Sequence, residues 1–126
     1  MLLDEYFQQI KILIDYSSII EESTLVYEAR SRDRGFIRGE LLLIDGSILF
    51  VQEFVKTTSI VDREMYTHQY MTADNKLIFR YDNTGHHRKL NLPTFPHHKH
   101  DRRETNVIAS NAPMLAAVIQ EIAQSF

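Results

Sequence analysis

Two runs of alternating side chains meet at Asp45-Gly46, and their pairing constrains the fold more than any other feature of the chain. Asp-Gly between two such runs is a strong signal for a two-residue hairpin turn. The runs are Phe36–Ile44 and Ser47–Thr57. Pairing the residues that flank the turn sets Arg38 opposite Glu53 as an opposite-charge pair. The turn and the side-chain pattern together predict an antiparallel hairpin.

The remaining elements extend this hairpin into an α+β fold. Apolar residues at three- and four-residue spacing predict a helix at each end of the chain, the first capped by Asp4 and the second by Ser110 or Asn111. The other expected elements are helix Asp4–Asp15, strands Ile19–Arg32, Arg63–Thr72 and Lys76–Asp82, and helix Ala112–Gln124. We therefore predict one domain, residues 1–126: an N-terminal helix, a five-strand antiparallel meander, a histidine-rich loop and a C-terminal helix.

One face of the second expected hairpin gathers rings. Its register places Tyr66, His68, Tyr70, Phe79 and Tyr81 on a common surface. Such a surface is either a core face with polar tips reaching solvent or a platform on which nucleic-acid bases stack. We favour the core face, because a sheet surface that packs against helices leaves no room for bases.

Composition excludes several classes of protein. The 126 residues are 44% hydrophobic and 25% charged, typical of a soluble globular domain. The longest apolar run has four residues, against the roughly 20 of a membrane helix, and we see no secretory signal. The chain has no cysteine, which excludes thiolate chemistry, and its net charge of −3 argues against a general nucleic-acid coat. We expect a cytoplasmic protein without a membrane partner.

The most unusual segment runs from Arg80 to Arg103 and holds five of the six histidines. It has no sustained periodicity, and a loop longer than about 15 residues inside a compact domain is usually functional or disordered. Its histidines and its bases after Arg80 are His86, His87, His97, His98 and His100, with Arg88, Lys89, Lys99, Arg102 and Arg103. A function that can be read from the sequence should therefore lie here.

Metal-independent cleavage of RNA is one chemistry that suits these residues. Attack of a 2′-hydroxyl on its adjacent phosphate needs a base, an acid and cations near the phosphate. The candidate acid and base are His86 or His87 and His98 or His100. The candidate phosphate contacts are Arg80, Lys99 and Arg102.

Two other interpretations stay open. Imidazoles bind zinc, nickel or copper, and Asp82 or Asp101 could add an oxygen ligand. However, His97, His98 and His100 lie too close in sequence for one metal to take all three readily, and the spacing matches neither the H-E-x-x-H nor the EF-hand pattern. We therefore expect no metal and no other cofactor. The histidines could also close the loop by bonding to backbone groups, which is the likelier role for any single one but not for five together.

Two motifs in this segment resemble those of the TumE family, the toxin component of two-gene toxin–antitoxin modules in bacteria and archaea. They are R-Y-D-N-x-x-H-H at 80–87 and T-F-P-H-H-K-H at 94–100, and the resemblance extends over most of the chain. It implies that the motif positions are Arg80, Tyr81, Asp82, His87, Pro96, His97, His98 and His100. It also implies an antitoxin partner, a DNA-binding protein encoded beside the toxin.

We therefore predict a toxin that acts on RNA through the histidine-rich loop. The expected catalytic residues are His87, His97, His98 and His100, and the expected substrate contacts are Arg80, Tyr81, Asp82, Lys99 and Arg102. The alternatives are a non-enzymatic toxin that binds and inhibits a cellular partner, and a metal-dependent hydrolase. An exposed edge strand would also permit a homodimer.

Overall fold

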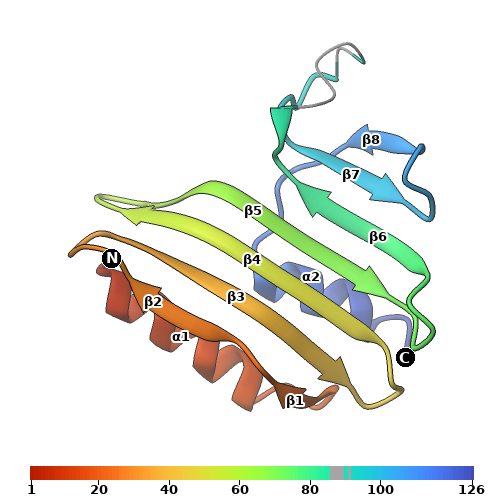
Figure 1. Cartoon of the computed structure of the whole chain (residues 1–126), viewed down its shortest axis with the longest axis horizontal. Coiled ribbons are helices and arrows are strands. Elements are labelled where there is room, and N and C mark those ends of the chain that lie inside the picture. Colours follow the sequence, from red (N-terminus) through yellow and green to blue (C-terminus); the bar gives the residue numbers. More distant parts are fainter. Residues whose placement is uncertain (86–89, 91) are drawn as a thin grey trace.

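The computed structural model describes residues 1–85, 90 and 92–126 and contains an antiparallel sheet with a helix at each end of the chain (Figure 1). The helices are α1 (Leu3–Asp15) and α2 (Leu115–Ala123). The strands are β1 (Ile20–Ser23), β2 (Val26–Ala29), β3 (Arg34–Leu43), β4 (Ile48–Thr57), β5 (Val61–Met71), β6 (Leu77–Asp82), β7 (His98–Asp101) and β8 (Val107–Ala109). The predicted α+β class is confirmed, with eight strands rather than five.

The strands follow one another across the sheet in the order β1-β3-β4-β5-β6-β7-β8. Strand β2 pairs with the same edge of β3 as β1, further along that strand. Both helices lie behind the sheet in Figure 1, so one sheet face is covered and the other is open. Strand residues alternate between these two faces. That alternation decides which side chains enter the core and which can meet a ligand.

The run expected as a single strand, Ile19–Arg32, is two strands. β1 and β2 both pair with β3 and are separated at Thr24 and Leu25, where the chain passes very close to Gly39. Gly39 has a φ of +153°, and a Cβ there would lie 2.6 Å from the Thr24 carbonyl oxygen. Only glycine permits this approach, which interrupts the outer strand.

The first hairpin forms at the predicted place but not in the predicted register. The Leu43 N–H donates to the Ser47 carbonyl at 2.9 Å, and Gly46 has a φ of +85°. The connection therefore has three residues and ends in a left-handed glycine, a common alternative to the two-residue turn. Arg38 pairs with Gln52 and Ile37 with Glu53, so the expected Arg38–Glu53 pair is wrong.

This shift by one residue turns Glu53 inward. A one-residue slip exchanges the faces of a whole strand. The inward residues of β4 include Leu49, Val51, Glu53 and Val55, all at most 1% exposed. Glu53 accepts a hydrogen bond from the Tyr6 hydroxyl of α1 and lies 2.7 Å from the His68 Nε2 atom of β5. A carboxylate thus sits in the core, held by two donors.

The second hairpin has the predicted pairing along most of its length. Tyr70 pairs with Phe79, His68 with Tyr81 and Gln69 with Arg80. The ring-bearing face is buried, with each of its five residues at most 7% exposed. It is a core face under the helices, and the base-stacking platform is excluded.

The helices differ from prediction only at their ends. The N-cap of α1 is Leu2 rather than Asp4, which lies in the first turn where its charge suits the positive end of the helix. α2 begins at Leu115, later than expected, and neither Ser110 nor Asn111 caps it. The Arg63 guanidinium donates hydrogen bonds to the carbonyl oxygens of Ala112 and Pro113, at 2.8 and 3.0 Å. Because these oxygens bind Arg63 rather than helical N–H groups, that segment stays outside the helix.

Two strands replace part of the expected histidine-rich loop. β7 pairs with β6, and β8 pairs with β7, so residues 98–101 are part of the sheet rather than of a loop. The short length of β7 and its polar H-K-H-D sequence conceal it from a search for alternating apolar residues. His86, His87, Arg88 and Lys89 lie outside the described residues.

Candidate functional site

The register between β6 and β7 brings the two sequence motifs together. Arg80 pairs with His100, and Asp82 pairs with His98. Because side chains alternate along each strand, all four project to the open face of the sheet. The polar group formed by Asp82, His98, His100, Arg80 and Glu104 is called the Asp82 site below.

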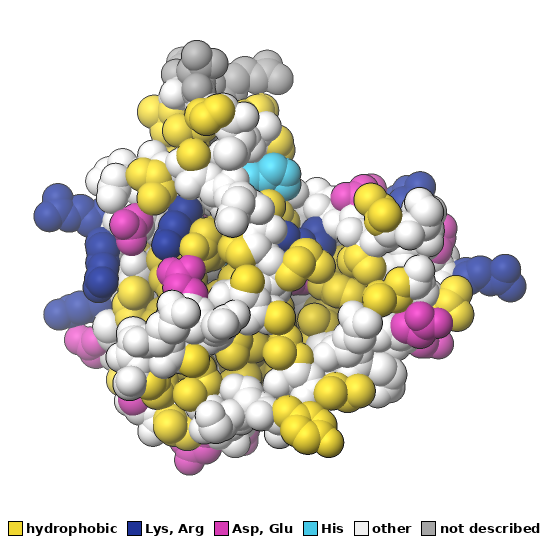
Figure 2. Space-filling model, turned by 180° about the vertical axis from the view of Figure 1, so that it is seen from behind, with side chains coloured by type: hydrophobic (Ala, Val, Ile, Leu, Met, Phe, Trp, Pro, Cys, Tyr) yellow, Lys and Arg dark blue, Asp and Glu magenta, His cyan; other side chains and the backbone are white. Residues whose placement is uncertain are grey.

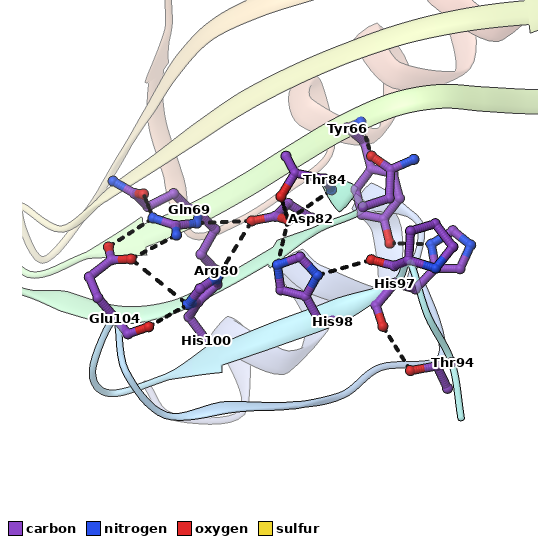
Figure 3. A network of polar contacts seen from close by, with 12 residues as sticks. Tyr66, Gln69, Arg80, Asp82, Thr84, Thr94, His97, His98, His100 and Glu104 are labelled. Atoms are coloured by element: carbon purple, nitrogen blue, oxygen red, sulfur yellow. Dashed lines mark hydrogen bonds and ion pairs between the residues drawn. The ribbon is translucent and has the colours of Figure 1, made fainter. Parts of the chain in front are cut away.

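Asp82 is the centre of this group, and its carboxylate meets neighbours on both oxygens (Figure 3). Its Oδ1 atom lies 2.7 Å from His98 Nε2 and accepts hydrogen bonds from the Thr84 N–H and hydroxyl, both at 3.1 Å. Its Oδ2 atom lies 3.0 Å from Arg80 Nε and 3.7 Å from His100 Nε2. Asp82 is 3% exposed, so these contacts form away from bulk water.

The backbone orients both imidazole rings in the same way. His98 Nδ1 lies 2.9 Å from the Pro96 carbonyl oxygen, and His100 Nδ1 lies 2.8 Å from the Glu104 carbonyl oxygen. A carbonyl only accepts, so each Nδ1 carries the proton and each Nε2 is directed toward Asp82. Burial lowers the pKa of His100, which favours its neutral form.

Arg80 and Glu104 form the outer edge of the site. The two guanidinium N–H groups donate to Glu104 at 2.8 and 2.7 Å, and one also donates to Gln69 at 3.0 Å. Burial lowers the pKa of Arg80, but the contacts with Glu104 and Asp82 outweigh it and raise the pKa above its ordinary value. The same pairing holds the pKa of Glu104 below its ordinary value. Arg80 is therefore a permanent cation at this site.

The Asp82 site lies against a polar pocket on the open face. This pocket has a volume of about 710 Å³, and its lining includes Asp82, Thr84, Arg80, His100 and Glu104. His98 stands behind Asp82 and does not line it. A substrate in the pocket would therefore meet Asp82, His100 and Arg80 first.

A second cavity lies on the opposite side, between the helices, and differs in character. It has a volume of about 460 Å³ and is lined mostly by apolar side chains such as Ile12, Leu13 and Met114. Figure 2 shows the helix side with hydrophobic side chains gathered around a hollow. This cavity offers apolar contact, while the pocket on the open face offers acid–base groups and charge.

The structure separates the other predicted site residues. Tyr81 and Lys99 lie on the helix side, where the Tyr81 hydroxyl and Lys99 Nζ donate to Glu121 of α2 at 2.6 and 3.1 Å. His97 Nδ1 lies 2.9 Å from the Tyr66 hydroxyl, and burial lowers the pKa of His97. Arg102 is exposed in the turn after β7 with a φ of +68°. His87 lies outside the described residues.

Sequence reasoning missed two members of this neighbourhood. Glu104 reaches Arg80 from 24 positions away through the turn between β7 and β8. The Thr84 N–H donates to the Asp82 carboxylate, as the N–H two positions after an aspartate often does, and the Thr84 hydroxyl adds a second bond. The D-N-T sequence at 82–84 could have indicated the role of Thr84, whereas the contact of Glu104 with Arg80 could be found only from the structure.

The comparison with protein families agrees with the motifs. The family model described as Toxin TumE matches residues 10–126. The chain belongs to the TumE toxin family. No curated protein and no solved structure was found to match this TumE-family chain. In the part of the chain that the structure describes, no helix is long and apolar enough to cross a membrane.

The Asp82 site of this TumE-family chain contains groups that can transfer protons or bind a cation. It combines two imidazoles, a buried carboxylate and a fixed guanidinium beside a pocket. Imidazole exchanges protons near neutral pH, and a guanidinium stabilises phosphoryl oxygens. These are the functional groups that phosphate-ester cleavage requires.

Proposed function

We propose that this toxin inhibits growth by cleaving RNA at the Asp82 site. The observation that carries the proposal is the convergence of two imidazoles and one carboxylate beside an open polar pocket. Arg80 stands next to them, already paired to Glu104 and Asp82, where it can stabilise negative charge on a scissile phosphate. An RNA strand would lie along the open face of the sheet, with one phosphate at the pocket.

The sequence-based form of this proposal is a metal-independent ribonuclease. In that form His100, which lines the pocket, takes the 2′-hydroxyl proton through its Nε2 atom as the new oxygen–phosphorus bond forms. It then returns this proton to the 5′-oxygen as the bond between phosphorus and that oxygen breaks. Asp82 and the Glu104 carbonyl hold the ring in place. His98 orients the carboxylate from behind, at 2.7 Å. The alternative is a metal-dependent hydrolase, which the orientation of the two rings toward one carboxylate supports.

We also propose that a protein antitoxin, DNA-binding as the family resemblance implies, neutralises this toxin. A non-enzymatic toxin that blocks a cellular partner through the same face is the competing proposal. The two differ in whether purified protein changes RNA. They agree that the Asp82 site is required for growth inhibition.

The test compares wild-type protein, D82N and a matched D74N control on total cellular RNA. Asp74 lies in the turn between β5 and β6 with 67% of its side chain exposed, and its contacts are a surface pair with Lys76 and a hydrogen bond from the Thr72 hydroxyl, both far from the Asp82 site. Asparagine at position 82 can still accept from Thr84, so the turn should survive. We expect cleavage by the wild type and by D74N, and at least a 100-fold slower rate for D82N.

Each reaction is run with chelator and with added divalent metal. Cleavage in chelator supports the metal-independent form, while cleavage only with metal supports the hydrolase form. Intact RNA in every arm, with growth arrest by the same protein in cells, would overturn the ribonuclease proposal in favour of the blocked-partner one. Circular dichroism of D82N checks that its loss of activity is not a loss of fold.

A further inference from the structure

We infer that Asp82, His98 and His100 together bind one divalent transition-metal ion. One ligand atom from each residue lies within 4.8 Å of the others, and all three residues are buried. Two of these separations are 2.7 Å, from His98 Nε2 to Asp82 Oδ1, and 3.7 Å, from His100 Nε2 to Asp82 Oδ2. Two ligand atoms bonded to one ion at about 2.0–2.2 Å lie roughly 3–3.5 Å apart. The His98–Asp82 pair at 2.7 Å would therefore widen slightly on binding, and the His100–Asp82 pair at 3.7 Å would close slightly.

The orientation of the rings is the first reason for this assignment. Each Nδ1–H donates to a backbone carbonyl, of Pro96 for His98 and of Glu104 for His100. Metal-binding histidines almost always donate their second ring nitrogen in this way, which fixes the tautomer and directs the lone pair of the other nitrogen to the ion. Here two rings on one strand, two residues apart, have that arrangement and aim at one carboxylate (Figure 3).

Charge is the second reason. Around the site one guanidinium, Arg80, faces two carboxylates, Asp82 and Glu104, so the group carries one net negative charge when the imidazoles are neutral. A bound divalent ion would change the sign of this balance and compensate the buried carboxylate, which is 3% exposed. Bound cations are often the largest local charges in such sites.

The ligand types select the class of ion. Two imidazoles and one carboxylate suit zinc, iron, nickel or copper, while magnesium and calcium prefer oxygen ligands alone. Three protein ligands would leave further coordination positions for water or substrate, which is the pattern of catalytic rather than structural metal sites. The ion would supply Lewis acidity at the phosphate or at a water molecule.

A simpler explanation of the same geometry is an ion pair between a protonated His98 and Asp82. It accounts for the 2.7 Å contact but assigns no role to His100, whose Nδ1 also faces a backbone carbonyl and whose Nε2 also faces Asp82. The two explanations predict different binding behaviour. An ion pair gives no stoichiometric metal affinity, whereas the metal site gives one ion per chain.

The test is metal binding by tag-free, chelator-treated protein, using Zn²⁺ in calorimetry and Co²⁺ in absorption spectroscopy. We expect one ion per chain with micromolar affinity or tighter, and visible absorption bands from bound Co²⁺. H98Q and H100Q should each weaken binding by at least 100-fold. H97Q removes a neighbouring histidine that faces Tyr66 instead, so it should leave the affinity unchanged.

Because H98Q and H100Q replace buried side chains, the thermal unfolding of the wild type supplies a readout that needs no variant. An ion bound only by the folded chain raises the melting temperature as its concentration exceeds the dissociation constant. A rise in Zn²⁺ that chelator reverses supports the site. No saturable binding below millimolar Zn²⁺, or equal binding by wild type and H98Q/H100Q, would overturn it.

The role of the ion in RNA cleavage rests on the proposed function, but its binding does not, so the two can fail separately. Stoichiometric binding with intact RNA would leave the metal site and remove the ribonuclease. Cleavage in chelator without any metal binding would do the reverse.

Discussion

Replacing the buried carboxylate of Glu53 with an amide should strongly destabilise the fold. Glu53 is fully buried, accepts a hydrogen bond from the Tyr6 hydroxyl, and accepts another from His68 Nε2 at 2.7 Å. The Arg63 guanidinium lies 3.9 Å away and gives the carboxylate its counter-charge. These contacts join α1, β4 and β5, so their loss should weaken the packing of all three elements.

The magnitude follows from the contacts that E53Q removes. A glutamine of the same shape can accept from one of the two donors, while its amide N–H₂ faces the other. One hydrogen bond to a charged group contributes about 1.5–3 kcal/mol. Removing one partner of a buried ion pair costs about 3–5 kcal/mol, here at Arg63. Arg63 keeps its hydrogen bonds to the carbonyl oxygens of Ala112 and Pro113, so these two costs overlap rather than add. We expect the free energy of unfolding to fall by about 3 kcal/mol, which a fold stable by about 5–15 kcal/mol survives.

Urea unfolding followed by circular dichroism measures this loss. E22Q is the matched control, because Glu22 is exposed on β1 and should change stability by less than about 0.5 kcal/mol. Y6F should cost less in the E53Q background than in the wild type, with a coupling of about 1 kcal/mol. A loss of unfolding free energy below about 1 kcal/mol for E53Q, or full additivity with Y6F, would refute a stabilising hydrogen-bond network at Glu53.

Two further predictions concern acid stability and the division of the sheet into two faces. Burial alone would raise the pKa of Glu53, but the hydrogen bonds from His68 and Tyr6 hold it below its ordinary value of 4.5. The ionised Glu53 carboxylate therefore stabilises the fold fully above its unfolded pKa of 4.5, and this stabilisation is lost as the pH falls through the lower folded pKa. The urea midpoint should then fall less steeply between pH 7 and pH 3 in E53Q than in the wild type. K99M removes the pair with Glu121 and the cation above the Phe79 and Tyr81 rings, and should lower the melting temperature through a loss of about 1 kcal/mol. Retained growth inhibition by K99M would support this structural role, whereas lost inhibition at unchanged stability would support the substrate contact that the sequence predicts.

Local patterns were sufficient for most of the fold. Apolar spacing gives both helices within a few residues, and the second hairpin has its predicted pairs from His68 to Tyr70. The first hairpin fails by one residue because Asp45-Gly46 fits both a two-residue turn and a three-residue turn that ends in glycine. The choice between them depends on which face of β4 packs better against α1 and α2, a property of the whole core.

The candidate site was predictable in its residue types but not in its geometry. The motifs contain Arg80, Asp82, His98 and His100, and the register of β6 with β7 brings these four together. That register could not be read from the sequence, since β7 is four polar residues after a proline-containing turn. Glu104 joins only because the next turn returns along the sheet.

Side chains alternate between the two faces of a strand, so neighbouring residues of one motif lie in different surroundings. Arg80 and Asp82 face the pocket, while Tyr81 between them enters the core. His98 and His100 face Asp82, while Lys99 between them pairs with Glu121 beneath the sheet. Alternate positions of R-Y-D and H-K-H therefore face opposite sides of the sheet: one set forms the candidate site, and the other set contacts the core and α2. Because β6 and β7 are both used in this way, the helix that closes the core also fixes the strand pair that assembles the site.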